Sequence, residues 1–166
     1  MRNSRFRILL GVSAAVLTVA AFTVTNTLAR QPSTYSNSSL AGSYAVVGTG
    51  GANEAASIGI TTFDGGGGAS RSLILNEADP NSSSRLIIEI PATGNYTVGS
   101  DGIGTAIFVN ELPDGSKIPF HFDFVITKAK RLGSHFSPVG TRLHMVQREP
   151  GIAAKLVTFD LYRLPE

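Results

Sequence analysis

The chain has 166 residues, of which 42% are hydrophobic and only 16% are charged, with 18 Gly and no Cys. Its length fits one domain with a short targeting segment, and the low charge and high glycine content exclude a coiled coil and a charged disordered protein. The lack of Cys excludes a disulfide framework, a thiolate metal site and a cysteine nucleophile.

The first 29 residues have the pattern of a secretory signal peptide. Three arginines precede the apolar run Ile8–Val24, and Thr27 and Ala29 offer small side chains before a cleavage site. This order predicts cleavage near Ala29 and a secreted or periplasmic protein. An uncleaved membrane anchor is the alternative, because the run reaches the lower limit of a spanning helix. Cleavage leaves eleven basic and twelve acidic residues, a net charge of −1, which argues against nucleic acid as a partner.

After the predicted signal peptide, the polar stretch 30–39 has no period and predicts a flexible leader. The domain over residues 40–166 has no second apolar run of membrane length, so we expect no membrane contact after cleavage. Its apolar residues alternate with a period of two, which indicates strands, and they are rich in Ile, Val, Phe and Thr. The predicted strands cover 42–49, 56–63, 69–77, 85–90, 94–99, 103–111, 117–127, 140–148 and 155–163.

Tight turns separate most of these strands. Asp-Gly pairs begin at Asp64, Asp101 and Asp114, and Asp-Gly favours a two-residue hairpin turn. Pro91 divides one long run into two strands, as expected at a bulge or corner. The fold class predicted is all-β, an eight- to nine-stranded antiparallel up-and-down barrel, with a two-sheet sandwich as the alternative.

Five segments of turn and strand residues carry a resemblance to a known family: Leu40–Tyr44, Thr62–Gly67, Gly94–Val98, Asp101–Thr105 and Phe122–Thr127. Together they resemble small secreted bacterial proteins similar to the barrel of allene oxide cyclase, in the calycin-like group. The resemblance covers residues 40–127 and implies an eight-stranded antiparallel barrel with an apolar interior for a small hydrophobic molecule. We carry no pocket residue of the cyclases over to a position here, because likeness of fold alone does not establish an activity.

Aromatic residues on the apolar phases of the strands are the candidate ligand-binding residues of the barrel interior. Alternatively, they fill the barrel as a packed core, because eight strands enclose just enough room for side chains. The six candidates are Phe63, Phe108, Phe120, Phe122, Phe124 and Phe159.

The motifs of common catalytic and metal sites are missing from the sequence, so we predict no catalytic residue, metal or cofactor. The Asp-Gly pairs lack a second carboxylate at calcium-loop spacing, and the glycine-rich stretches lack the Lys of a phosphate loop. His121, Asp123, Arg142 and His144 fall on the polar phases of two neighbouring strands. We interpret them as a cross-strand charge ladder rather than a polar site.

These observations favour a secreted β-barrel binding module that holds a small hydrophobic ligand or associates with itself. Apolar residues on both phases of several strands, such as Ile87 and Val125, support a homo-oligomer. The alternative is an allene oxide cyclase-like cyclase or isomerase with its site inside the barrel, which would need a buried ionisable group on an inward phase. The acidic candidates near strand ends, Glu54 and Glu111, are expected to be exposed, so the sequence favours a protein that is not an enzyme.

Overall fold

The computed structural model describes five parts of the chain, all in one compact unit: residues 34–50, 55–79, 81–131, 137–149 and 156–165. The predicted signal peptide lies outside these residues. No helix within them has the length and apolar character needed to cross a membrane.

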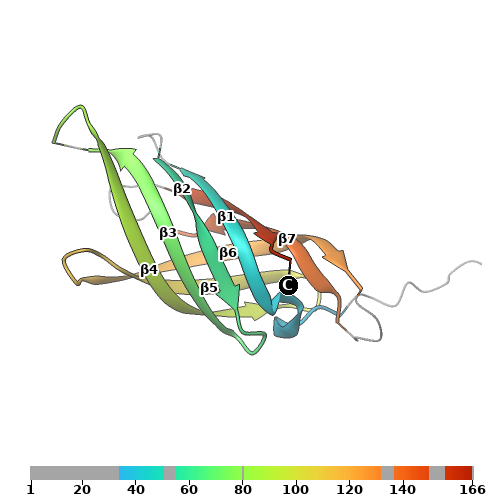
Figure 1. Cartoon of the computed structure of the whole chain (residues 1–166). Coiled ribbons are helices and arrows are strands. Elements are labelled where there is room, and N and C mark those ends of the chain that lie inside the picture. Colours follow the sequence, from blue (N-terminus) through green and yellow to red (C-terminus); the bar gives the residue numbers. More distant parts are fainter. Residues whose placement is uncertain (1–33, 51–54, 80, 132–136, 150–155, 166) are drawn as a thin grey trace, which may run out of the picture. The chain divides into compact units, whose positions relative to one another are not determined.

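Eight antiparallel strands, each hydrogen-bonded to the next along the chain, close into an up-and-down barrel (Figure 1). The last strand pairs with the first, from Tyr44 opposite Arg163 to Gly50 opposite Val157. This closure confirms the predicted barrel and rules out the sandwich. The elements are η1 (Asn37–Leu40), β1 (Gly42–Gly50), β2 (Ala55–Phe63), β3 (Gly68–Ala78), β4 (Arg85–Val98), β5 (Ile103–Glu111), β6 (Lys117–Lys130), β7 (Val139–Gln147) and β8 (Val157–Arg163).

The predicted strands 85–90 and 94–99 are one strand, β4, so the barrel has eight strands and not nine. Pro91 lies within β4 opposite Ser72 of β3. The pairing of β4 with β5 begins only at the next residue, Ala92, opposite Asn110. At Pro91, β4 therefore pairs with β3 alone. A proline, which has no N–H to donate, is tolerated where a strand lacks a neighbour on one side.

The period-two pattern determines which side chains fill the barrel. In β6, Phe122 and Phe124 are buried while Asp123 and Val125 are exposed, because a strand turns alternate side chains to opposite faces. Every strand contributes to one core, whose buried members are Leu40, Tyr44, Val46, Phe63, Leu73, Ala92, Tyr96, Ala106, Phe108, Phe122, Phe124, Ile126, Leu143, Met145, Phe159 and Leu161.

Two inward-facing glycines make room for large rings on neighbouring strands. A Cβ on Gly48 would overlap the ring of Phe159 and the Ser57 hydroxyl, and a Cβ on Gly104 would overlap the ring of Phe124. A barrel of eight strands has room for large side chains only where their neighbours are small.

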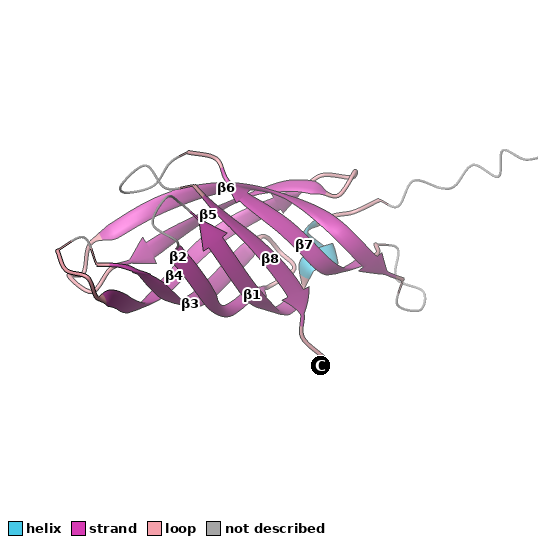
Figure 2. Ribbon diagram, turned by 90° about the horizontal axis from the view of Figure 1, so that it is seen from above, coloured by secondary structure: helices cyan, strands magenta, loops and turns pink. Residues whose placement is uncertain are grey.

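One end of the barrel, the plugged end, is filled by η1, which Figure 2 shows as the cyan helix beside the end of β7. Leu40 of η1 is fully buried in the core. Tyr44 donates its hydroxyl to the Gly140 carbonyl at 2.7 Å, and Arg163 donates to the Ala41 carbonyl at 2.5 Å. Arg163 of β8 thus holds the residue that links η1 to β1, while Tyr44 connects β1 to β7.

A second tyrosine joins η1 to the β2–β3 turn. Tyr96 donates its hydroxyl to the Asn37 carbonyl at 2.9 Å and accepts the Gly65 N–H at 3.0 Å. Burial raises the pKa of Tyr96 to about 12, so the hydroxyl keeps its proton at neutral pH. Residues 34–39, the described part of the expected leader, therefore pack on the barrel, with Ser39 fully buried.

Substitution of Phe122 by Ala tests the assigned direction of β6. The ring is 2% exposed, so its removal should lower the free energy of unfolding by about 3–5 kcal/mol. His121→Ala, at the neighbouring half-exposed position, should change it by less than about 1 kcal/mol. Urea unfolding of both variants measures the difference, and a larger loss for His121→Ala would contradict the assigned direction.

Candidate functional site

The structure divides the six candidate phenylalanines between different parts of the interior. Five are buried, and Phe120 is partly buried against the same core. Phe122 contacts Phe108 and Phe159, with ring centroids 6.1 and 5.7 Å apart. Phe63 lies at the plugged end, where it packs edge-on against Tyr44 and Tyr96 at 5.5 and 4.8 Å. The candidates therefore do not form one site.

A buried arginine of β3 lies among three of these rings. The guanidinium carbon of Arg71 is 4.2 Å from the ring centroid of Phe108 and 5.3 Å from those of Phe122 and Phe159. A cation this close to aromatic faces is attracted to their π electrons. These contacts come from β3, β5, β6 and β8, so the site assembles only when the barrel closes.

Arg71 carries its charge without an acidic partner among the described residues. The side chain is 5% exposed, and burial lowers its pKa to about 9, which leaves the guanidinium charged at neutral pH. Nη2 donates to Oδ1 of Asn110 at 3.0 Å, whereas Nε is buried with no hydrogen-bond partner. Burial of an unpaired cation costs several kcal/mol, which the neighbouring rings offset in part.

Small residues lie beside the arginine on the two strands next to β3, and further polar residues are buried in the barrel. Thr61 and Ala92 lie directly opposite Arg71 on β2 and β4, and their short side chains leave room for the long one. Ser57 and Gln147 are also buried, and Gln147 lies opposite Phe122 in the β6–β7 register. The middle of the barrel therefore combines aromatic rings, one cation and uncharged hydrogen-bonding groups.

Sequence reasoning missed Arg71, which is the buried ionisable group that it sought without success. The sequence feature that could have identified Arg71 as inward-facing is the alternation in β3. Arg71 shares a phase with Leu73, while Ser70 and Ser72 occupy the other phase. The residue type indicates the opposite, because arginine is almost never fully buried without a partner. Glu111 is exposed as expected, and Glu54 lies outside the described residues.

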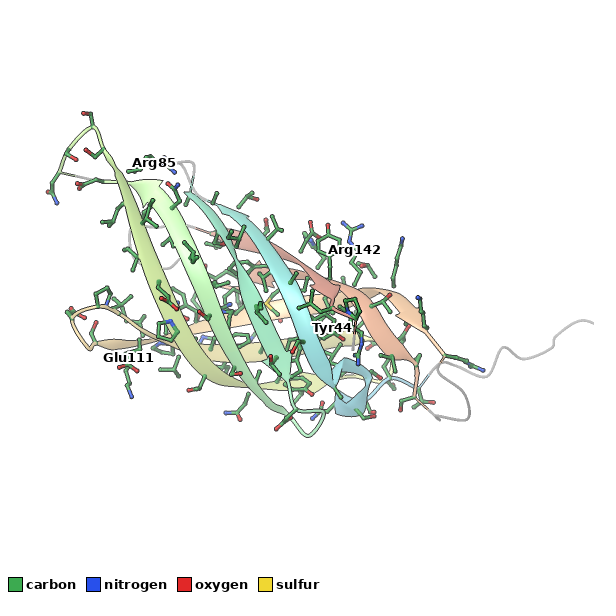
Figure 3. All side chains as sticks on the ribbon, in the orientation of Figure 1. Tyr44, Arg85, Glu111 and Arg142 are labelled. Carbon is green, nitrogen blue, oxygen red and sulfur yellow. The ribbon has the colours of Figure 1, made fainter. Side chains whose placement is uncertain are left out.

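The end of the barrel opposite η1, here called the distal end, differs from the plugged end. In Figure 3, Tyr44 lies beside η1, while Arg85 and Glu111 mark the distal end. The β3–β4 hairpin diverges there from the β5–β6 hairpin (Figure 1). Several large inward-phase apolar side chains at this end are only partly buried; they include Leu75, Ile88 and Ile118.

A hollow of about 570 Å³ lies beside this divergence. It is lined mostly by outward-facing side chains of β2 to β6, including Ile60, Pro91 and Lys117, and it reaches Arg71 and Ala92 on the inward phase. The hollow therefore approaches the strand segments that carry the arginine from outside the barrel.

The predicted outer charge ladder exists with different partners. Asp123 pairs with Arg148 at 2.5 Å, and this guanidinium lowers the pKa of Asp123. Arg142 and His144 both contact Asp160 of β8, at 3.5 and 3.3 Å.

A fourth pair joins His121 to Glu149, and the residues of all these pairs are between a third and about half exposed. Pairs this exposed stabilise a fold little. In the part of the chain that the structure describes, no three His, Asp or Glu side chains come together as a metal site.

Comparison with protein-family models, curated proteins and solved structures gives no match to this chain.

Substitution of Arg71 by Met should preserve the fold. Methionine has a similar length without the charge, and exchange of buried charges for apolar groups is often neutral or stabilising by about 1–4 kcal/mol. We expect a free energy of unfolding equal to or above that of the wild type in urea titrations. A loss of more than about 2 kcal/mol would show that the arginine is a main support of the core.

Proposed function

We propose that this protein is a small β-barrel binding module that takes up a small hydrophobic ligand through the distal end. The signal-like N-terminal sequence supports a secreted or periplasmic location for it. The β-barrel itself is the established part, and barrels of about eight strands can hold one small ligand in their interior.

The difference between the two ends of the barrel is the observation that carries the proposal. At the plugged end, Leu40 and Tyr44 are fully buried and η1 fills the opening. At the distal end, Leu75 and Ile88 of the inward phase keep part of their surface exposed. Apolar surface that faces inward without complete burial is what a ligand would cover.

The cyclase or isomerase alternative has less support, although the similarity to the allene oxide cyclase barrel motivates it. Its chemistry needs a group that transfers protons near neutral pH. The buried polar residues in the described part of the chain are Ser39, Ser57, Thr61, Arg71, Asn110 and Gln147, with no carboxylate or histidine among them. Arg71 stays protonated at neutral pH, so it can bind negative charge but is a poor general base.

Self-association is a second candidate, favoured by an apolar row on the outer face. Val47, Ile58 and Ile74 lie opposite one another across β1, β2 and β3. Their side chains are 49%, 59% and 48% exposed. A row of adjacent exposed aliphatic residues is typical of a surface that contacts another protein, and a second copy of this chain is the proposed partner.

Leu75→Trp should weaken binding of N-phenyl-1-naphthylamine, a neutral apolar dye that fluoresces in apolar surroundings. The larger side chain narrows the distal end, and we expect at least a tenfold loss of affinity, which corresponds to about 1.4 kcal/mol. Ile107→Trp is the matched control, because it adds the same ring at an exposed aliphatic residue on the outer face of β5, away from the apolar row. Fluorescence titration measures both, and absence of dye binding to the wild-type barrel would overturn the proposed ligand-binding function.

Ile58→Glu should dissociate the proposed oligomer, because a charge at the centre of the row would be costly to bury between two copies. Sedimentation velocity at several protein concentrations should show a monomer for this variant and a larger species for the wild type. Ile103→Glu is the control, at a similarly exposed position on β5. A monomeric wild type at all concentrations would contradict self-association through this row.

A further inference from the structure

We infer that the ligand is an amphipathic carboxylate, whose single negative charge pairs with Arg71 and whose apolar body extends toward the distal end. This inference depends on the proposed ligand-binding function and names the chemical class that the interior selects. The feature that supports it is a charged side chain inside the barrel that has hydrogen-bonding capacity left unused.

The charge of the interior determines the charge of the ligand. Arg71 is the single charged residue among the buried residues that the structure describes, and none of the ion pairs between described residues involves it. A monoanion would neutralise it, since opposite charges attract strongly where water is excluded. A dianion such as a phosphate monoester would leave an uncompensated negative charge in the same place, at a large desolvation cost.

The free donors of the guanidinium fit a carboxylate. Nε of Arg71 has no acceptor, and Nη2 has a second N–H besides the one that donates to Asn110. Nε and Nη2 share one edge of the planar guanidinium, and a carboxylate accepts two parallel hydrogen bonds from such an edge. Asn110 keeps the guanidinium oriented, and the ring of Phe108 supports its face at 4.2 Å.

The surroundings of Arg71 select an apolar body behind the carboxylate. Between Arg71 and the distal end, the inward phase of β3 continues with Leu73 and Leu75, and that of β4 with Ile90 and Ile88. A ligand that followed this path would contact aliphatic side chains over its length and meet the cation only at its inner end. Small polar anions would gain the charge pairing without this apolar contact and would bind weakly.

Three ten-carbon probes test the inference: decanoate, 1-decanol and decyl phosphate. Each is titrated against the dye-loaded full-length protein at pH 8 and low salt, and displacement of N-phenyl-1-naphthylamine gives the affinity. We expect decanoate to bind the wild type at least tenfold more tightly than 1-decanol and more tightly than decyl phosphate. Equal affinities for decanoate and 1-decanol would overturn the inference while leaving the proposed function intact, whereas failure of all probes and of the dye would overturn both.

Variants of Arg71 connect the preference to this side chain. Arg71→Met should abolish the preference for decanoate with little change for 1-decanol, and Arg71→Lys should keep part of it because the charge remains. Arg142→Met is the matched control, since it removes the same charge from the outer face. Loss of the preference in the control as well would assign the effect to general surface charge and overturn the inference.

A measurement on the wild type covers the case that Arg71→Met does not fold. With decanoate labelled with ¹³C at its carboxyl carbon, the carbon signal follows the protonation of the bound ligand. A guanidinium neighbour should lower the pKa of the bound carboxyl group below that of free decanoate, because it stabilises the charged form. A raised pKa would indicate a purely apolar environment and would contradict pairing with Arg71.

Discussion

The pairing of β8 with β1 is the constraint on which the rest of the structure depends. Once the sheet is closed, each strand has two neighbours, and its inward phase has to fit a space of fixed width. Large rings on one strand then require small residues opposite, as with Phe159 beside Gly48 and Phe124 beside Gly104. The arginine site follows the same rule, since Thr61 and Ala92 on the adjacent strands leave the space that Arg71 occupies.

Three of the segments expected from the sequence to resemble the allene oxide cyclase barrel meet at the plugged end. Leu40–Tyr44 supplies the buried Leu40 and Tyr44, Thr62–Gly67 supplies Phe63, and Gly94–Val98 supplies Tyr96. Their side chains pack together, and their hydroxyls bind neighbouring carbonyls: Tyr96 donates to Asn37 of η1, and Tyr44 donates to Gly140 of β7. These segments therefore close one end of the barrel. Of the residues at the arginine site, only Phe122 belongs to a segment with this expected resemblance; Arg71, Phe108 and Phe159 lie outside all of them.

Strand positions could be predicted from the sequence because alternation reports burial directly. In β6 the phenylalanines and the polar residues separate cleanly into two phases. The proline in β4 misled the prediction, since a proline predicts a break, yet β4 lacks its second neighbour at that residue. Arg71 could not be assigned for a different reason: in β3 the residue type predicts an exposed position and the phase predicts a buried one. Only the rings brought from β5, β6 and β8 decide between them, and those contacts are not local in sequence.

The unpaired charge also connects stability to binding. Arg71 occupies the core at a desolvation cost that the aromatic rings of Phe108, Phe122 and Phe159 offset only in part. A bound monoanion would remove much of that cost, so the ligand-bound barrel should be the more stable form. Because a ligand that binds only the folded state stabilises it by RT ln(1 + [L]/Kd), a hundredfold excess over Kd corresponds to about 2.7 kcal/mol. With Met at position 71 the core would hold no such charge, and the anionic group of a ligand would then add nothing to the stability of the barrel.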